Sequence, residues 1–121
     1  MTRGARKAGL SRRHRFVGRG AFAPALHSPR KLRGTAMLLH VAAGPAGASR
    51  LGLSVPKRQA SQAVDRNRIK RLAREAFRQH RVRALGLDLV FTVRQKFVRG
   101  AEAAWRAEIV ALLDRASGEA A

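Results

Sequence analysis

Residues 61–83 have the sequence S-Q-A-V-D-R-N-R-I-K-R-L-A-R-E-A-F-R-Q-H-R-V-R. This stretch contains no Gly or Pro, and its apolar residues recur at helical spacing. They lie at positions i, i+3, i+4, i+7 and i+8, and they are Ile69, Leu72, Ala73, Ala76 and Phe77. The pattern predicts a long amphipathic helix with one buried face, and Ser61 is its expected N-cap.

The opposite side of this predicted helix carries positive charge. Its polar residues recur at spacings of three and four, and they are Asn67, Lys70, Arg71, Arg74, Arg78 and Arg81. Glu75 is the only acid between residues 66 and 83. A solvated face usually mixes both signs, because like charges one turn apart repel each other. The stripe therefore favours a polyanionic partner. A merely solvated helix and a membrane-surface or calmodulin-target helix are the alternatives, although the narrow, alanine-rich apolar face favours packing inside a domain.

The charge balance of the whole chain supports a nucleic-acid partner. The 121 residues include 26 basic and 7 acidic ones, which gives a net charge of +19. Residues 1–99 hold 24 basic and 3 acidic residues, or +21, whereas residues 100–121 hold 2 basic and 4 acidic ones, or −2. A phosphate polyanion is the default partner of so basic a protein, and its binding surface is expected before Gly100.

The sequence offers no candidate catalytic residues and no candidate metal ligands. It contains no Cys, so it has no disulfide, thiolate metal site or cysteine nucleophile. A two-metal nuclease needs several convergent carboxylates, but residues 1–99 contain only Asp65, Glu75 and Asp88. The four histidines are scattered without a carboxylate cluster, and they are His14, His27, His40 and His80. Acid–base chemistry by a pair of histidines is the remaining alternative.

The order of predicted elements is αββαβα, which indicates an α+β domain with a small, mostly antiparallel sheet and packed helices. A short helix at 20–27 with Pro24 in its first turn precedes a strand at 35–42. A turn at 44–47 then leads to a strand at 51–55, and the two strands are expected to form an antiparallel hairpin. After the long helix come a strand at 87–93 and a helix from 101. The core face of that last helix is expected to contain Trp105, Ile109, Leu112, Leu113 and Ala116.

The domain is expected to span residues 16–117, after a basic flexible arm at 1–15 and before a short tail at 118–121. No apolar run has the length of a signal-peptide core or a membrane span, so a cytoplasmic protein without a membrane contact is predicted. A transit peptide is the alternative for the arm.

Two neighbouring motifs resemble the protein subunit of bacterial ribonuclease P. They are R-L-G-L-S-V-P-K-R at 50–58 and D-R-N-R-I-K-R-L-A-R-E-A-F-R at 65–78. Weaker similarity at 13–16, 20–22 and 87–91 extends the resemblance over about residues 13–113. The resemblance implies an α/β sandwich with a left-handed β-α-β crossover. It also implies that the RNA subunit, with bound Mg²⁺, is the catalyst that removes the 5′ leader of precursor tRNA. The partners implied are therefore the ribonuclease P RNA and precursor tRNA, and no protein partner is required.

The resemblance also assigns residues to two kinds of RNA contact. The residues expected to bind RNA are Lys57, Arg58, Arg66, Asn67, Arg68, Lys70, Arg71, Arg74, Arg78 and Arg94. Arg66 and Arg68 lie at the edges of the charged stripe, so the alternative for them is to hold the helix to its own domain.

Phe22, Leu26 and His40 are expected to bind the single-stranded leader, although two of them are weaker stacking platforms than the aromatic residues of the family. Phe22 has a core position as its alternative. Two other classes remain open for the whole chain: a ribosomal-type binder of structured RNA, and a DNA-binding module with the basic helix in a major groove.

Overall fold

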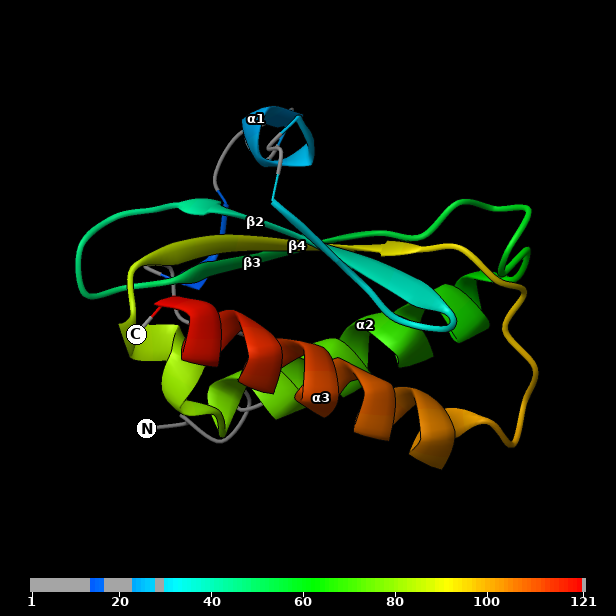
Figure 1. Ribbon diagram of the computed structural model, residues 1–121. Coiled ribbons are helices and arrows are strands. Elements are labelled where there is room, and N and C mark those ends of the chain that lie inside the picture. Colours follow the sequence, from blue (N-terminus) through cyan, green and yellow to red (C-terminus); the bar gives the residue numbers. More distant parts are fainter. Residues whose placement is uncertain (1–13, 17–22, 28–29, 121) are drawn as a thin grey trace, which may run out of the picture.

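The computed structural model describes residues 14–16, 23–27 and 30–120. Its sheet contains β1 (Lys31–Arg33), β2 (Met37–Ala43), β3 (Arg50–Ser54) and β4 (Leu87–Val93). Its helices are α1 (Ala23–Leu26), α2 (Ala63–Arg78), the 3₁₀ helix η3 (Arg81–Ala84) and α3 (Glu102–Ala120). Figure 1 shows α2 and α3 on one face of the sheet and α1 on the other. The α+β prediction is confirmed, with one additional short strand, β1.

The strands lie in the order β1-β2-β4-β3. The pairs β1–β2 and β2–β4 are antiparallel, whereas β3 and β4 are parallel. The predicted hairpin between residues 35–42 and 51–55 is therefore wrong, because β4 lies between these two strands. Phe91 of β4 is in register with Leu39 on one side and with Leu53 on the other. The turn at 44–47 was predicted from neighbouring residues alone. Such a pattern does not indicate which strand lies beside β2 in the sheet.

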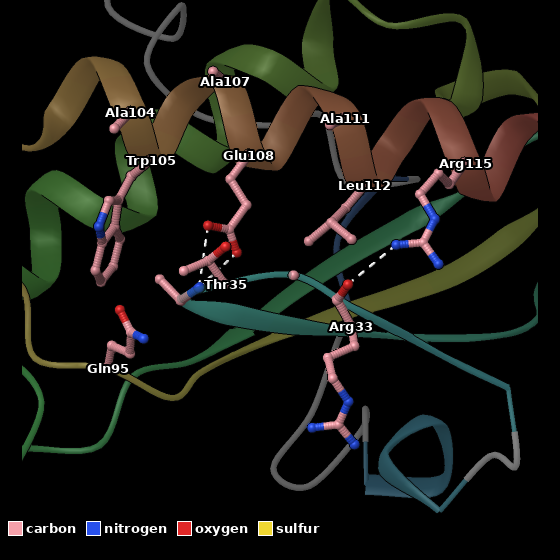
Figure 2. Close-up of a pocket in the computed structure, with 12 residues that line it drawn as sticks. Arg33, Thr35, Gln95, Ala104, Trp105, Ala107, Glu108, Ala111, Leu112 and Arg115 are labelled. Carbon is pink, nitrogen blue, oxygen red and sulfur yellow. Dashed lines mark hydrogen bonds between the residues drawn. The ribbon is translucent and has the colours of Figure 1, made fainter.

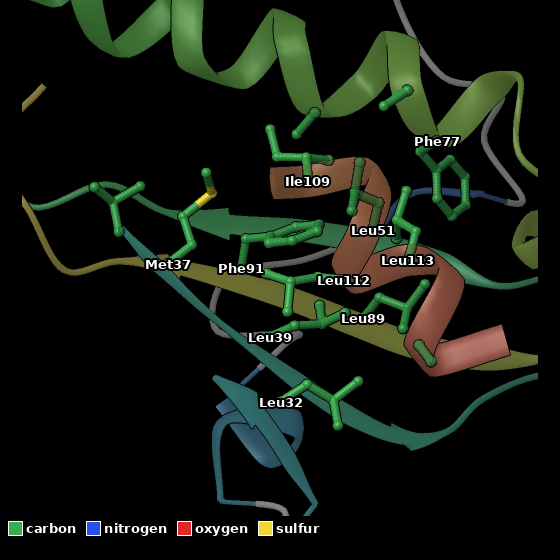
Figure 3. Close-up of a cluster of buried hydrophobic side chains, with 14 of the residues drawn as sticks. Leu32, Met37, Leu39, Leu51, Phe77, Leu89, Phe91, Ile109, Leu112 and Leu113 are labelled. Carbon is green, nitrogen blue, oxygen red and sulfur yellow. The ribbon is translucent and has the colours of Figure 1, made fainter. Parts of the chain in front are cut away.

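The hydrophobic core lies between the sheet and the two long helices (Figure 3). Met37, Leu39 and Val41 point from β2 into this core. Ile69 and Phe77 of α2 are fully buried against them. The predicted core face of α3 is buried throughout. Leu72 is only partly buried at the margin of the cluster.

The outer face of the sheet is also largely covered. Leu38, His40 and Val90 alternate with the core residues, and all three are buried. The small helix α1 packs over β2 and β4 on this side, where its Ala25 is 3% exposed. Since both faces of β4 are buried, its sequence L-D-L-V-F-T-V is almost continuously apolar.

Helix α2 begins one residue later and ends earlier than expected. Its N-cap is Gln62, whose side chain makes no capping hydrogen bond, so the predicted cap at Ser61 is wrong. The Gln62 carbonyl instead accepts hydrogen bonds from the N–H groups of Asp65 and Arg66, both at 3.1 Å. The predicted helix to residue 83 stops at Arg78, and the separate turn η3 follows. Gly86, with φ of 76°, then lets the chain turn into β4.

Residues 14–16 lie against β3, although they stand at the border of the predicted arm. The Nδ1 of His14 hydrogen-bonds to the Ser49 carbonyl at 2.9 Å, and Arg15 forms an isolated parallel bridge with Leu51. The Arg50 guanidinium stacks over Phe16 at 4.8 Å. Residues 1–13 lie outside the described part of the chain. At the other end, α3 remains helical through Ala120, where a tail was predicted.

Candidate nucleic-acid interface

The charged stripe predicted on α2 lies on the side of the helix that faces away from the core. Because Ile69, Ala73, Ala76 and Phe77 are buried, the polar residues of the stripe lie on the other side of the helix. Asn67 and Arg71 are exposed, and the predicted RNA contacts that are half-buried on α2 are Arg66, Lys70, Arg74 and Arg78. The helix therefore presents a continuous basic surface to solvent.

Two of the predicted RNA contacts bind their own domain. A terminal guanidinium nitrogen of Arg66 donates hydrogen bonds to the carbonyls of Ala60 and Ser61, both at 2.9 Å. Arg68 forms an ion pair with Glu102 of α3 at 3.1 Å. These contacts support the alternative assignment, in which Arg66 and Arg68 hold α2 to the preceding loop and to α3. The Arg68 side chain still keeps 42% of its surface exposed.

A basic hollow of about 180 Å³ lies beside the edge strand β3. It brings together Lys70 and Arg74 of the stripe, Leu51 and Leu53 of β3, and Arg15. The sequence analysis placed Arg15 in the arm and did not assign it to this surface. Its place next to β3 depends on the long-range bridge to Leu51, for which the sequence carries no local signal.

A second hollow, here named the outer groove, lies on the α1 side of the sheet and has a volume of about 530 Å³. It brings together four residues predicted from the resemblance, namely Leu26, His40, Arg58 and Arg94. Phe22, the third predicted leader residue, lies outside the described residues. Lys57 is exposed in the loop before α2 and does not line the groove.

The outer groove also contains polar residues that the sequence analysis missed. Ser54, Gln59 and Thr92 line it, and Thr92 is in register with both Ser54 and Leu38. Alternation along β4 places Thr92 on the outer face. The alternation places Thr92 beside Ser54 and Leu38 only once β4 is known to lie between β2 and β3.

His40 is held in its neutral form on the floor of the outer groove. Burial lowers the pKa of its imidazole, and the positive charges of Lys31 and Arg94 lower it further. Its Nε2 hydrogen-bonds to the Thr92 hydroxyl at 3.1 Å. Among the described atoms, Nδ1 is buried and has no hydrogen-bond partner. The lowered pKa favours the uncharged ring, which lines the groove between flanking cations although His40 is only 6% exposed.

Within residues 14–16, 23–27 and 30–120, no three His, Asp or Glu side chains come together as metal ligands. No helix in the same part of the chain has the length and apolar character needed to cross a membrane.

The fold and these surfaces define a small basic α+β protein with a candidate RNA-binding face. The sequence profile of the family described as Ribonuclease P matches residues 10–117. The chain belongs to the ribonuclease P protein family.

Known relatives agree with this assignment. The ribonuclease P protein component of Nitrosomonas eutropha is 43% identical over 81 residues, which are 65% of this chain and 67% of that protein. The component of Nitrosomonas europaea is 59% identical over 46 residues, which are 38% of this chain but only 39% of that protein. A mutant of the Staphylococcus aureus RNase P protein has the same fold, with a TM-score of 0.71 at 23% identity, covering 86% of this chain and 88% of that one.

Proposed function

We propose that this chain is the protein subunit of the ribonuclease P ribonucleoprotein, which removes the 5′ leader of precursor tRNA in the cytoplasm. The family match over residues 10–117 supports the subunit role. The observation that carries the assignment of substrate is the outer groove, which brings Leu26 and His40 together with two cations, Arg58 and Arg94.

In this proposal the protein supplies binding and orientation, while the RNA subunit and its Mg²⁺ supply the chemistry. Exposed Asn67 and Arg71, with Lys70 and Arg74 beside them, contact the phosphates of the RNA subunit. Such contacts give affinity but little discrimination, because phosphates are present in substrate and product alike. Discrimination between precursor and mature tRNA therefore needs a second surface.

The outer groove has the composition expected of that second surface. The leader is single-stranded, so its base faces are exposed, and only the precursor carries it. Leu26 and the neutral ring of His40 provide apolar contact for a base, while Arg58 and Arg94 attract the flanking phosphates. Ser54, Gln59 and Thr92 add hydrogen-bonding groups at the same place.

Reconstitution tests the proposal directly. The full chain is added to a bacterial ribonuclease P RNA at low Mg²⁺, and cleavage of precursor tRNA is followed. We expect stimulation of cleavage and tighter binding of precursor than of mature tRNA. Arg94→Ala should reduce the preference for precursor, whereas Arg106→Ala, which changes an exposed cation of α3 away from the groove, should not. Absence of stimulation, together with equal competition by unrelated structured RNA or duplex DNA in band-shift assays, would assign the chain to another class of nucleic-acid binder.

A further inference from the structure

The outer groove continues beyond the site described above. It shares Leu38 and Arg94 with a smaller hollow of about 180 Å³, here named the end notch, at the start of β2 and the end of β4. The end notch shares Arg33, Gly34, Thr35 and Gln95 with a third hollow of about 540 Å³ under α3, here named the α3 groove. These shared residues make the three hollows neighbours, in order from the α1 side of the sheet to the helical side.

The α3 groove has one apolar wall and one polar wall (Figure 2). Ala104, Ala107 and Ala111 of α3 form the apolar wall, and all three are exposed. Arg33 and Gln95 lie on the other side. Trp105 also lines the groove, but its ring is only 7% exposed and packs edge-to-face against Phe97.

The carboxylate inside the α3 groove already makes hydrogen bonds to the backbone of its own chain. The carboxylate of Glu108 accepts hydrogen bonds from the N–H groups of Ala36 and Met37, at 2.9–3.1 Å. Arg115, about two turns further along α3, donates to the Arg33 carbonyl at 3.1 Å and is exposed. The Arg33 side chain points away from α3 (Figure 2), so Arg115 is the cation that lines this groove.

We propose that the leader, after crossing the outer groove, continues through the end notch and places a further unpaired nucleotide in the α3 groove. This inference rests on the proposed function. Cations recur along the path: Arg58 and Arg94 at the outer groove, Arg33 at the end notch, and Arg115 at the α3 groove. Single-stranded RNA alternates charged phosphates with apolar base faces, which matches the cations and apolar surfaces along this path. An apolar peptide would not need a cation at each step.

The test measures how affinity changes as the leader is lengthened one nucleotide at a time. The assembled enzyme is titrated with precursor tRNAs that differ only in leader length. We expect a first gain when the leader fills the outer groove and a second, severalfold gain when it reaches the α3 groove. The second gain should be smaller than that of stacking on a fully exposed aromatic ring, since the groove offers alanines and a buried Trp edge.

Two matched variants separate this groove from the rest of α3. Ala104→Glu places a carboxylate in the groove, and Ala103→Glu places the same charge on an exposed position of α3 that does not line it. Circular dichroism melting first verifies that both variants fold. Ala104→Glu should abolish the second gain and leave short-leader binding unchanged, whereas Ala103→Glu should keep both gains.

Each outcome of the experiment is assigned. A wild type without the second gain, or equal behaviour of the two variants, overturns the extended path while short-leader binding still supports the proposed function. Loss of precursor preference at every leader length in the wild type would overturn both. The extended path is supported if the wild type and Ala103→Glu both show the second gain in affinity and Ala104→Glu does not.

Discussion

The carboxylate of Glu108 occupies the space that a side chain at residue 34 would need. A Cβ added to Gly34 would collide with Glu108 Oε2 and would lie 3.0 Å from its Cδ. From this position Glu108 accepts hydrogen bonds from the N–H groups of Ala36 and Met37, and Figure 2 shows those from Ala36. Because Gly34 has no side chain, Glu108 of α3 can bind the turn between β1 and β2. This turn forms one wall of the α3 groove.

The first prediction concerns this pair. Gly34→Ala should displace Glu108 and lower the free energy of unfolding by about 1.5–3 kcal/mol, the usual value of a hydrogen bond to a charged group. Urea unfolding measures the effect. In a Glu108→Ala background the same change should cost far less, because the contact is already absent.

Gly118→Ala is the control for this prediction. Residue 118 is exposed in α3, and no atom lies within 4 Å of an added Cβ. The substitution should therefore stabilise the helix by up to about 1 kcal/mol. Additive effects of Gly34→Ala and Glu108→Ala would contradict the interpretation.

The second prediction separates the two faces of α2. Arg71→Ala removes an exposed cation and should weaken binding to the RNA subunit while changing stability by less than about 0.5 kcal/mol. Ile69→Ala removes a fully buried side chain and should cost about 2–5 kcal/mol. Thermal melting and band-shift titration of each variant measure the two effects. Equal destabilisation by both would mean that Arg71 has a structural role.

The third prediction is a pH dependence due to His40. Because burial and the neighbouring Lys31 and Arg94 lower the pKa of this imidazole, the unfolded chain binds a proton more readily than the folded one. Above the unfolded pKa of about 6.5, His40 therefore does not change the free energy of unfolding. As the pH falls below that value, protonation of His40 in the unfolded chain lowers the free energy of unfolding. His40→Gln should make the stability less sensitive to pH below about 6.5, as measured by urea unfolding at a series of pH values. His27→Gln, at an exposed position after α1, is the control. An unchanged pH slope in His40→Gln would remove His40 as its source.

The fourth prediction is a gain of function in the outer groove. Leu26 lines this groove and is half-buried, so Leu26→Phe should add a stacking surface and strengthen precursor binding by at most about 1–3 kcal/mol. Binding of mature tRNA should not change, because it has no leader. Leu85→Phe, at an exposed position 40% open to solvent, is the control. Equal gains for precursor and mature tRNA would place the added ring against another part of the RNA.

The fifth prediction is a steep dependence of RNA binding on salt. With a net charge of +21 on residues 1–99, we expect about 6–10 phosphates to be neutralised. The association constant should then fall by about 10³–10⁵ between 50 and 200 mM salt. Titrations at several salt concentrations measure the slope, and a flat response would contradict an electrostatic interface.

The elements with strong internal periodicity were predictable from the sequence. The apolar face of α2, the core face of α3 and the alternation of Met37, Leu39 and Val41 all depend on residues close together in the chain. The helical patterns also report which side is buried, whereas both faces of β2 are buried.

Strand pairing was not predictable in the same way. The insertion of β4 between β2 and β3 joins residues such as Leu39, Leu53 and Phe91 across long stretches of sequence. The almost continuously apolar sequence of β4, L-D-L-V-F-T-V, was a usable sign of a central strand, and Val90 on its outer face is fully buried. The short strand β1 has three residues and is too short for a periodic signal.

The candidate site was predictable in part. Leu26, His40, Arg58 and Arg94 were assigned by resemblance, and they line one groove. Ser54, Gln59 and Thr92 carry no motif of their own, and their grouping depends on the pairing of β4 with both neighbours. The intramolecular contacts of Arg66 and Arg68 likewise depend on the positions of the preceding loop and of α3.

The central place of β4 has a consequence for how the protein is made. Synthesis proceeds from the N-terminus, and β4 is the last strand to leave the ribosome. Until it emerges, β3 has no strand beside it and β2 has only the short β1. A nascent chain that ends before residue 87 therefore cannot assemble the sheet, and its apolar strands stay exposed to other chains. The basic α2 segment leaves the ribosome before β4, so its positive charge is present before the sheet that supports the helix has formed.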